Sequence, residues 1–423
     1  MMNFGQKREG RCIVKAERYK ERNWLLMQSG PSHPGRESAD SGRAGTYQRQ
    51  LSGYRAFIPG PLPPSPPIRV GGELQSLLSR ADLALGRLDG SILILPNPDL
   101  FVMMYVRKEA VLSSQIEGTQ SSLQDLLRAE AHLHHPQTPK DVAEVINYVG
   151  AMNHGLLRLS DLPVSVRLIR EIHARLLAGV RGSHLAPGEL RTSQNWIGPK
   201  GCTLDEAFFV PPPPHIVSDA LGNLEQFLHE ESRLPTLIRI GVAHAQFETI
   251  HPFLDGNGRV GRLLITFLLM NSGVLKKPVL YLSHYLKEHR TAYYELLQGI
   301  RERGAWEDWL AFFLRGIAEV SDQAAETARR ILAQREADRA LIADNLGRAA
   351  GNGHRVLEHL YQKPIVAVNS VKDLLRITYP AANQLVERLV RIGVLHEITG
   401  QARHRRFRYD AYVRLFDMVK GAP

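Results

Sequence analysis

The chain has 423 residues, of which 43% are hydrophobic, so it can fill the cores of two to three domains of ordinary size. Its formal net charge of +10 favours polyanionic partners such as nucleic acid, a membrane surface or nucleotide phosphates, unless it serves solubility alone. The two distant cysteines, Cys12 and Cys202, exclude a disulfide framework, and no apolar run is long enough to span a bilayer. We therefore expect a cytoplasmic protein that has no signal peptide and no membrane partner.

The first part of the chain predicts irregular structure followed by helices. Residues 1–46 are polar, basic and rich in Gly, Ser and Arg, which is typical of a flexible extension, and the proline-rich segment 59–68 predicts extended chain. From Leu74 onward, apolar residues recur at spacings of three and four, which indicates helices. The expected helices begin at Leu74, at Asn97-Pro98 (ending at Gly118) and at Leu123, and then cover residues 141–158, 165–178, 215–230 and 235–250.

Two features between these helices predict other structure. The apolar runs Asn195–Ile197 and Phe208–Pro211 flank a Gly-Pro turn, which indicates a β-hairpin closed by four prolines. His132, His134 and His135 precede Pro136. They fit an exposed loop better than a metal site, because no acidic or cysteine partner is near them in the sequence.

The C-terminal residues predict a separate unit after a helical linker, which we expect to run over residues 317–342. Short helices are expected at Val356–Leu360, Val371–Leu375 and Pro380–Ile392, followed by strands around 394–398 and 407–409. A helix-turn-helix followed by a basic hairpin is typical of a winged-helix domain. Its basic residues predict contact with DNA phosphates, and contact with protein is the equal alternative: Arg388, Arg391, Arg403, His404, Arg405, Arg406 and Arg408.

The richest chemistry lies between His251 and Arg262. Spacings of three and four place Leu237, His244 and His251 on one helix face, so His251 ends a helix that Pro252 stops. The run Asp255-Gly256-Asn257-Gly258 predicts a tight loop before an apolar helix at Leu263–Met270. Because a helix N-terminus presents free N–H groups and a positive dipole end, we expect an anion-binding site there.

The remaining side chains of this segment suit phosphoryl or nucleotidyl transfer. His251 is a candidate base, and Asp255 is a candidate Mg²⁺ ligand. Arg259 and Arg262 lie three residues apart at the helix start, where both can bind phosphate oxygens. A metal-dependent hydrolase using His251 and His244 is a weaker interpretation, because it lacks a third ligand and explains neither arginine.

The segment resembles the signature of Fic (Fido-domain) proteins at every fixed position: His251-Pro252-Phe253-Leu254-Asp255-Gly256-Asn257-Gly258-Arg259-Val260-Gly261-Arg262. The resemblance implies an all-α helical core that transfers AMP from ATP to a Tyr, Ser or Thr hydroxyl of a target protein, including the chain itself. It implies that His251 deprotonates the hydroxyl and that Asp255 binds Mg²⁺ on the α- and β-phosphates. Gly256, Asn257 and Gly258 would cradle the phosphates, and Arg259 and Arg262 would engage the β- and γ-phosphates.

A second segment, from Ser113 to Gly118, resembles the inhibitory motif of the same family. It implies an N-terminal inhibitory helix whose Glu117 pairs with Arg262 and occupies the space of the γ-phosphate. The alternatives are a surface glutamate before a helix-ending glycine, or a glutamate that positions water for the removal of AMP.

Other residues resemble the family more loosely. Asn195–Ile197 and Phe208–Pro211 resemble the flap, a small β-hairpin that holds the target segment by strand pairing, and Phe209 would line the nucleotide pocket. Tyr293 and Tyr294 resemble positions near adenine, with helix-core aromatics as the alternative. DNA, through the winged helix, and a second copy of the chain are the other candidate partners, and a DNA-binding regulator is the competing function.

The resemblance covers about residues 47–320, and together with the sequence patterns outside this range it gives the expected organisation. It comprises a flexible extension (1–46), an N-terminal helical domain carrying the inhibitory motif (47–160), a catalytic core (161–320), a helical linker (321–350) and a winged-helix domain (351–423).

Overall fold

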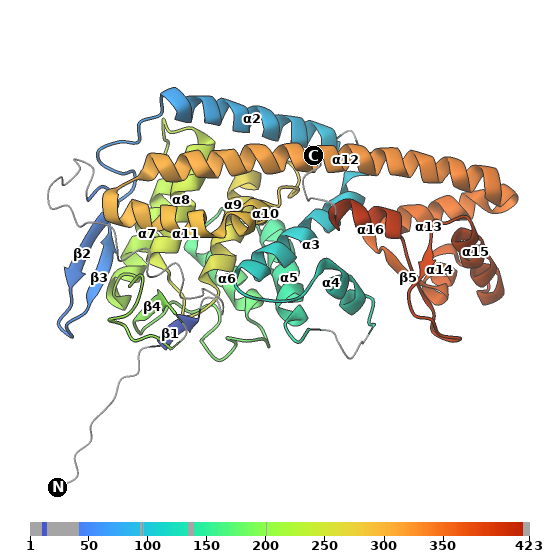
Figure 1. Ribbon diagram of the computed structural model, residues 1–423, viewed down its shortest axis with the longest axis horizontal. Coiled ribbons are helices and arrows are strands. Elements are labelled where there is room, and N and C mark those ends of the chain that lie inside the picture. The colour runs from blue at the N-terminus through green and yellow to red at the C-terminus, as the bar shows by residue number, and fades with distance from the viewer. Residues whose placement is uncertain are drawn as a thin grey trace, which may run out of the picture.

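The computed structural model describes residues 11–14, 42–93, 95, 97–133, 139–199 and 201–417. The fold is mostly helical, as expected, and Figure 1 shows the elements. The helices before the C-terminal unit are α2 (Gly72–Leu93), α3 (Pro98–Ile116), α4 (Leu123–Glu130), α5 (Val142–Arg158), α6 (Val166–Leu176), α7 (Pro214–His229), α8 (Thr236–Ile250), α9 (Asn257–Asn271), α10 (Ser283–Glu288), α11 (Arg290–Arg303) and α12 (Trp306–Leu346).

The helices α8 and α9 form the centre of the core. Both are buried on nearly all sides, and an apolar helix with no polar face needs neighbours all around it. Trp309 of α12 donates its indole N–H to the Gly241 carbonyl oxygen of α8 at 2.9 Å. A side chain at Gly241 would collide with Leu310, so the glycine allows the close approach of α8 and α12.

The helix α12 extends the core into the C-terminal unit. It runs without interruption for 41 residues, and Figure 1 shows it alongside α2 across the top of the molecule. The expected linker helix is therefore the second half of α12, and the expected domain border at residue 320 falls inside this helix. The buried face of α12 is mostly apolar from Trp306 to Ile331, then carries the charged Arg335 and Asp338, and is apolar again at Ile342 and Leu346, although the helix itself does not end.

The ordered fold begins earlier than expected. Strands β2 (Gly45–Arg49) and β3 (Arg55–Pro59) form an antiparallel hairpin that the sequence did not predict. Arg43 is 4% exposed and pairs with Glu307 of α12 at 3.0 Å, so the prediction of a flexible extension is wrong for residues 42–46. The partner lies 264 residues away, beyond the reach of local patterns.

The flap is less regular than expected. Strand β4 (Asn195–Gly198) forms, but the second arm is a single antiparallel bridge between Phe209 and Ile197. The prolines after Val210 donate no backbone hydrogen bonds and so cannot extend the pairing. The other edge of β4 pairs in parallel with β1 (Arg11–Val14), which lies within the expected extension.

The C-terminal unit contains the expected helices and three further elements. It comprises η1 (Gly347–Ala349), α13 (Ala350–Gln362), β5 (Ile365–Ala367), α14 (Val368–Leu375), α15 (Tyr379–Arg391), β6 (His396–Glu397), β7 (Arg406–Arg408) and α16 (Asp410–Asp417). The strands form one sheet in the order β5-β7-β6, and the sequence predicted neither β5 and α16 nor the short 3-10 helix η1. The unit packs on α3, where the rings of Phe101 and Tyr361 are 4.7 Å apart.

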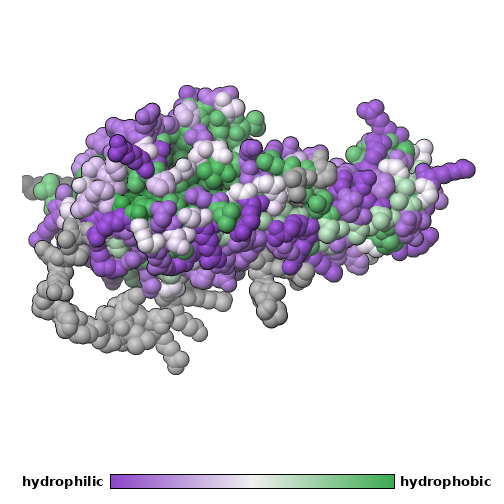
Figure 2. Space-filling view, turned by 90° about the horizontal axis from the view of Figure 1, so that it is seen from above, coloured by the Kyte–Doolittle hydropathy of each residue, from purple (hydrophilic) through white to green (hydrophobic). Residues whose placement is uncertain are grey.

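The described helices can be examined for membrane-spanning character. Within the described residues, no helix combines the length and the apolar character needed to cross a bilayer. Figure 2, seen from above Figure 1, shows hydrophilic and hydrophobic residues interspersed over this face. Leu83 of α2 is among the exposed hydrophobic side chains.

Candidate functional site

His251 lies where α8 ends, as the sequence predicted. Its N–H still donates to Phe247 at 2.9 Å, but its backbone turns into the left-handed region, with φ at 49° and ψ at 59°. The side chain is nearly buried, at 1% exposure, and Nδ1 lies 3.4 Å from the Glu248 carbonyl oxygen. A proton on Nδ1 directed at that carbonyl would make Nε2 the basic nitrogen.

The helix after the loop begins six residues earlier than predicted. Gly256 is the N-cap, with φ at 79°, and α9 starts at Asn257 rather than at Leu263. The polar residues from Asn257 to Arg262 hide this start in the hydropathy pattern, although they are buried. Asn257 and Gly258 therefore lie in the first turn, where backbone N–H groups have no partner within the helix.

The amide of Asn257 holds the loop in place. Its Oδ1 accepts from the Phe253 N–H at 2.8 Å, and its Nδ2 donates to the Phe253 carbonyl at 2.7 Å. This side chain therefore fixes the turn between His251 and α9.

The expected pairing of Glu117 with Arg262 is present. Arg262 Nη2 lies 2.9 Å from Glu117 Oε1, Nε donates to Ser113 Oγ at 2.8 Å, and Nη2 also donates to the Ser113 carbonyl at 3.0 Å. Burial disfavours the charged guanidinium, but the Glu117 carboxylate and other neighbours outweigh it and raise the pKa of Arg262. Nη1 of Arg262 has no hydrogen-bond partner among the described residues.

The Glu117 carboxylate lies against the first turn of α9. A Cβ at Gly258 would lie 2.2 Å from Glu117 Oε1 and 3.1 Å from Arg262 Nη1. Glu117 is the C-cap of α3, and the following Gly118, with φ at 100°, turns the chain away as predicted. The structure therefore places an anionic group at the expected anion-binding site.

Arg259 interacts with other carboxylates than Glu117. Its Nη1 pairs with Glu144 at 3.0 Å, and its Nη2 lies 3.8 Å from Asp255. Glu144 also lies 3.5 Å from Arg181, and burial raises the pKa of Glu144 against the opposing effect of Arg259. Glu144 was not predicted as a site residue. The signal was present, because Glu144 lies on the buried stripe of α5 with Tyr148.

His173 supports the loop that carries Asp255. Its Nδ1 accepts from the Gly188 N–H at 2.8 Å, so Nε2 carries the proton and donates to the Asp255 carbonyl at 3.0 Å. Its ring stacks on Phe253 with centroids 3.7 Å apart. Burial lowers the pKa of His173 to about 4, which keeps the ring neutral near pH 7. The sequence patterns did not predict His173 as a site residue either.

The carboxylate of Asp255 is the candidate metal ligand. Oδ1 accepts from the Gly256 N–H at 2.6 Å, and the side chain is 26% exposed. The described residues contain no cluster of three His, Cys, Asp or Glu side chains suited to a metal ion. Mg²⁺ is commonly held by one or two carboxylates plus phosphate oxygens, so a single carboxylate beside an anion site fits that ion.

Other expected site residues lie in the core. Tyr293 is 1% exposed, and its hydroxyl lies 2.9 Å from His244 Nε2, while His244 Nδ1 lies 2.9 Å from the Gly261 carbonyl. Phe209 is 3% exposed and packs under Arg301, whose guanidinium carbon is 3.7 Å from the ring centroid. His132 lies in the turn after α4 with a positive φ, and His134 and His135 lie outside the described residues.

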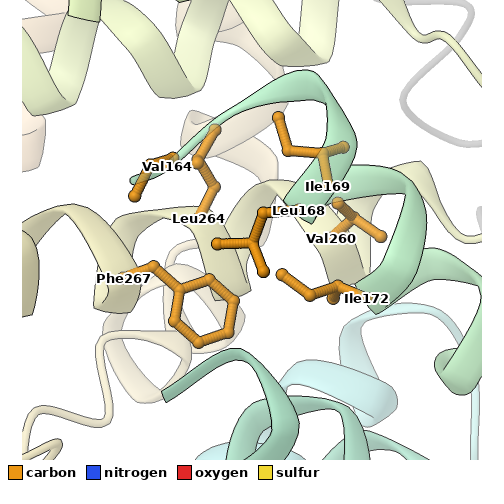
Figure 3. A pocket seen from close by; sticks show the side chains of 7 residues that line it. All are labelled: Val164, Leu168, Ile169, Ile172, Val260, Leu264 and Phe267. Carbon is orange, nitrogen blue, oxygen red and sulfur yellow. The ribbon is translucent and has the colours of Figure 1, made fainter. Parts of the chain in front are cut away.

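A small recess lies between α6 and α9, away from the polar groups of the site. Figure 3 shows that its lining is entirely hydrocarbon: Val164, Leu168, Ile169, Ile172, Val260, Leu264 and Phe267. It offers no group that could bind a phosphate. The polar site is instead the surface formed by Glu117, the α9 N-terminus and the two arginines.

Fold and site together define an all-α protein with an anion-binding helix N-terminus beside a histidine. Residues 75–157 match the family model described as Fic/DOC family N-terminal, and residues 163–269 match that of the Fic/DOC family. The candidate site lies within these two matched regions, which we therefore assign to the Fic/DOC family.

Relatives with curated names agree with this assignment. A probable protein adenylyltransferase of Aquifex aeolicus is 27% identical over 198 residues, which cover 45% of this chain and 56% of that protein. The protein adenylyltransferase Fic of Culex quinquefasciatus is 34% identical over 164 residues, covering 38% of this chain and 29% of that protein. The chain thus spans about half or less of the length of these relatives.

A solved structure shares the fold. A Fic family protein from Desulfovibrio desulfuricans G20 superposes with a TM-score of 0.53 at 18% identity, covering 84% of this chain and 99% of the other.

Proposed function

We propose that the protein transfers AMP from ATP to a Tyr, Ser or Thr hydroxyl of a protein, itself included, and that Glu117 restrains the reaction. The observation that carries the proposal is the Glu117 carboxylate at the first turn of α9, paired with Arg262. A site that binds one anion in this way has the donors needed to bind phosphate. The curated names of the relatives support AMP as the transferred group and a protein as the acceptor.

The phosphates fit the groups around the α9 N-terminus. Gly256, Asn257 and Gly258 supply backbone N–H groups, and Nη1 of Arg262 lacks a partner in the described residues and points toward Gly258. We infer that Arg259 and Arg262 bind the β- and γ-phosphate oxygens. Bound at Asp255 and the phosphates, Mg²⁺ would neutralise charge on the departing pyrophosphate.

The chemistry requires one base and one leaving group. His251 accepts the proton of the target hydroxyl, whose oxygen attacks the α-phosphorus of ATP. The bond between the α-phosphorus and the oxygen that bridges to the β-phosphate breaks, and pyrophosphate leaves with that oxygen. The buried donors at the α9 N-terminus stabilise charge on the phosphate oxygens during this step.

Glu117 obstructs this arrangement. Its carboxylate holds Arg262 and lies where a phosphate would contact Gly258. ATP would therefore bind with its γ-phosphate displaced, in a pose unsuited to in-line attack. The same carboxylate could also orient a water for AMP removal, so release of AMP from modified protein is the second activity to assay.

The flap suits a protein acceptor. A target segment would pair with the edge of β4 that β1 occupies in this structure. Two of the basic side chains in the C-terminal unit have acidic partners, since Arg405 lies 3.3 Å from Glu387 and Arg408 pairs with Asp410. DNA binding by this unit therefore has less support than the enzyme.

A four-protein comparison tests the proposed function. Wild type, Glu117→Gly, His251→Ala and the double variant are incubated with Mg²⁺ and ATP labelled at the α-phosphorus. We expect weak self-labelling of the wild type, strong labelling of Glu117→Gly, and none in either protein that carries His251→Ala. Label that persists without His251 would contradict the mechanism, whereas equal labelling of wild type and Glu117→Gly would contradict only the restraint.

A further inference from the structure

Arg191 is a buried guanidinium that is bonded to backbone carbonyls. It is 3% exposed, and no carboxylate of the described residues lies within ion-pairing distance of it. Burial lowers the pKa of Arg191 to about 9, so keeping this charge in the core is unfavourable by itself. Such a residue must be held by other bonds.

The guanidinium of Arg191 donates to the carbonyls of Pro212 and Ser193, and its other bonds go to the backbone next to His251. Nε donates to the His251 carbonyl at 2.9 Å, Nη2 to the Ile250 carbonyl at 3.3 Å, and the backbone N–H to the Pro252 carbonyl at 2.9 Å. Ile250 ends α8, so its carbonyl has no donor within the helix. Arg191 therefore caps the C-terminal end of α8 and also binds the carbonyls of the two residues that follow the helix.

Asn195 also donates hydrogen bonds to the backbone around His251. It is fully buried, and its Nδ2 donates to the His251 carbonyl at 3.2 Å and to the Phe253 carbonyl at 2.9 Å. Four consecutive carbonyls, from Ile250 to Phe253, thus accept bonds from Arg191 and Asn195. Between them lies the left-handed turn at His251, which a residue with a side chain adopts only when its surroundings hold it there.

We propose that Arg191 is a positioning residue for His251. Together with Asn195, it fixes the backbone that aims the imidazole, and it does so from the flap side of the site. Because Asn195 is the first residue of β4, the strand proposed to receive the target segment is bonded directly to the residue that accepts the target's proton. The bond between Asn195 and His251 would therefore fix the position of the target hydroxyl, held on β4, relative to the His251 imidazole. This inference rests on the proposed function.

A matched control exists in the same chain. Arg239 also caps a helix end with its guanidinium, since its Nη2 donates to the Phe227 and Leu228 carbonyls of α7 at 3.0 Å and 2.7 Å. It has no contact with His251 among those described. Arg239→Gln therefore removes the same kind of bond, without touching the site.

The test compares Arg191→Gln, Arg191→Lys and Arg239→Gln, each made in the full-length Glu117→Gly protein. Initial rates of self-labelling are measured against ATP concentration. Misplacing a reacting group by about 1 Å can cost about 100-fold in rate, so we expect kcat of Arg191→Gln to fall about 100-fold. The KM for ATP should stay within about threefold, because the phosphates are held by α9. Arg191→Lys should recover part of kcat, and Arg239→Gln should retain it.

A second readout does not depend on enzyme activity. Carbethoxylation of His251 by diethyl pyrocarbonate, followed by mass spectrometry of its peptide without ATP, reports how well the imidazole is held. We expect faster modification in Arg191→Gln and no change in Arg239→Gln. If Glu117→Gly incorporates no label, the proposed function fails, while this readout still tests the positioning.

Three results would overturn the inference. They are a kcat of Arg191→Gln within about threefold of its parent, equal losses of kcat in Arg191→Gln and Arg239→Gln, and unchanged carbethoxylation of His251. Should Arg191→Gln not fold, Arg191→Lys is judged by the same criteria.

Discussion

Glu117 Oε1 lies 2.9 Å from Arg262 Nη2, although the two residues are 145 positions apart in the chain. The Arg262 side chain is 1% exposed and that of Glu117 is 12% exposed. The pair thus joins the end of α3 to the first turns of α9, and it uses a guanidinium that the proposed reaction needs for phosphate.

Removing Glu117 should therefore lower the stability of the fold and strengthen the binding of MgATP. Breaking a buried ion pair from one side costs about 3–5 kcal/mol, and we expect a smaller loss in Glu117→Gly because Ser113 still binds Arg262. MgATP should raise the thermal midpoint of Glu117→Gly more than that of wild type, because the phosphates replace the lost carboxylate. Thermal unfolding with and without MgATP measures both effects.

Glu130→Gly is the control for this comparison. Glu130 ends α4 and pairs at 2.8 Å with Arg107, whose side chain is 8% exposed, so the change removes a similar pair. It should lower stability and leave the response to MgATP unchanged. Equal responses in all three proteins would show that Glu117 does not compete with ATP.

Asp255 should set the requirement for Mg²⁺. Because Asp255 is the only site carboxylate proposed to bind the ion, Asp255→Asn should raise the Mg²⁺ concentration for half-maximal labelling by more than about tenfold. His173 holds the backbone of this loop, so the variant should keep the fold. The measurement is a Mg²⁺ titration of labelling in Glu117→Gly, and undiminished labelling in excess EDTA would contradict it.

His173 should make the protein sensitive to acid. Its pKa is about 4 in the folded chain and 6.5 in an unfolded one, so unfolding takes up a proton between these values. The stability that the neutral ring provides is complete above pH 6.5 and is lost as the pH falls toward 4, by about 3 kcal/mol in total.

Urea unfolding at several pH values tests this assignment. His173→Gln lacks the titrating group, so its unfolding free energy should fall less than that of wild type between pH 6.5 and pH 4. Parallel curves for the two proteins would rule out His173 as the source of the acid sensitivity.

Strand β1 should shield the edge of β4. Ile197 exchanges backbone hydrogen bonds with Phe209, so the N–H groups of Trp196 and Gly198 face the other edge, where β1 pairs. Deleting residues 1–41 should speed hydrogen exchange at Trp196 and Gly198 and leave Ile197 unchanged, which makes Ile197 an internal control. Unchanged exchange at all three would mean that β1 does not protect this edge.

The sequence predicted what depends on local pattern. The end of α8 at His251, the stop at Gly118 and the pairing of Glu117 with Arg262 are all confirmed, because a long motif and helical spacing carry them. The start of α9 was predicted too late, since buried polar residues at a site do not follow the hydropathy pattern of an ordinary helix.

The missed residues share a different cause. Arg43, Glu144 and Arg191 act through partners 264, 115 and 60 positions away, respectively, and each is a charged side chain that is buried. Because charged residues are mostly exposed, the sequence alone leads one to expect such residues at the surface. Only the three-dimensional contacts show that Glu144 holds Arg259 and that Arg191 holds the turn at His251.

The most direct test of AMP transfer follows two labels from the same nucleotide. Glu117→Gly is incubated with Mg²⁺ and ATP labelled either at the α-phosphorus or at the γ-phosphorus, with Glu117→Gly/His251→Ala as the control. AMP transfer predicts that protein retains the α label, loses the γ label as pyrophosphate, and retains neither in the control. Protein that retains the γ label would be phosphorylated rather than modified with AMP, and that result would contradict the account.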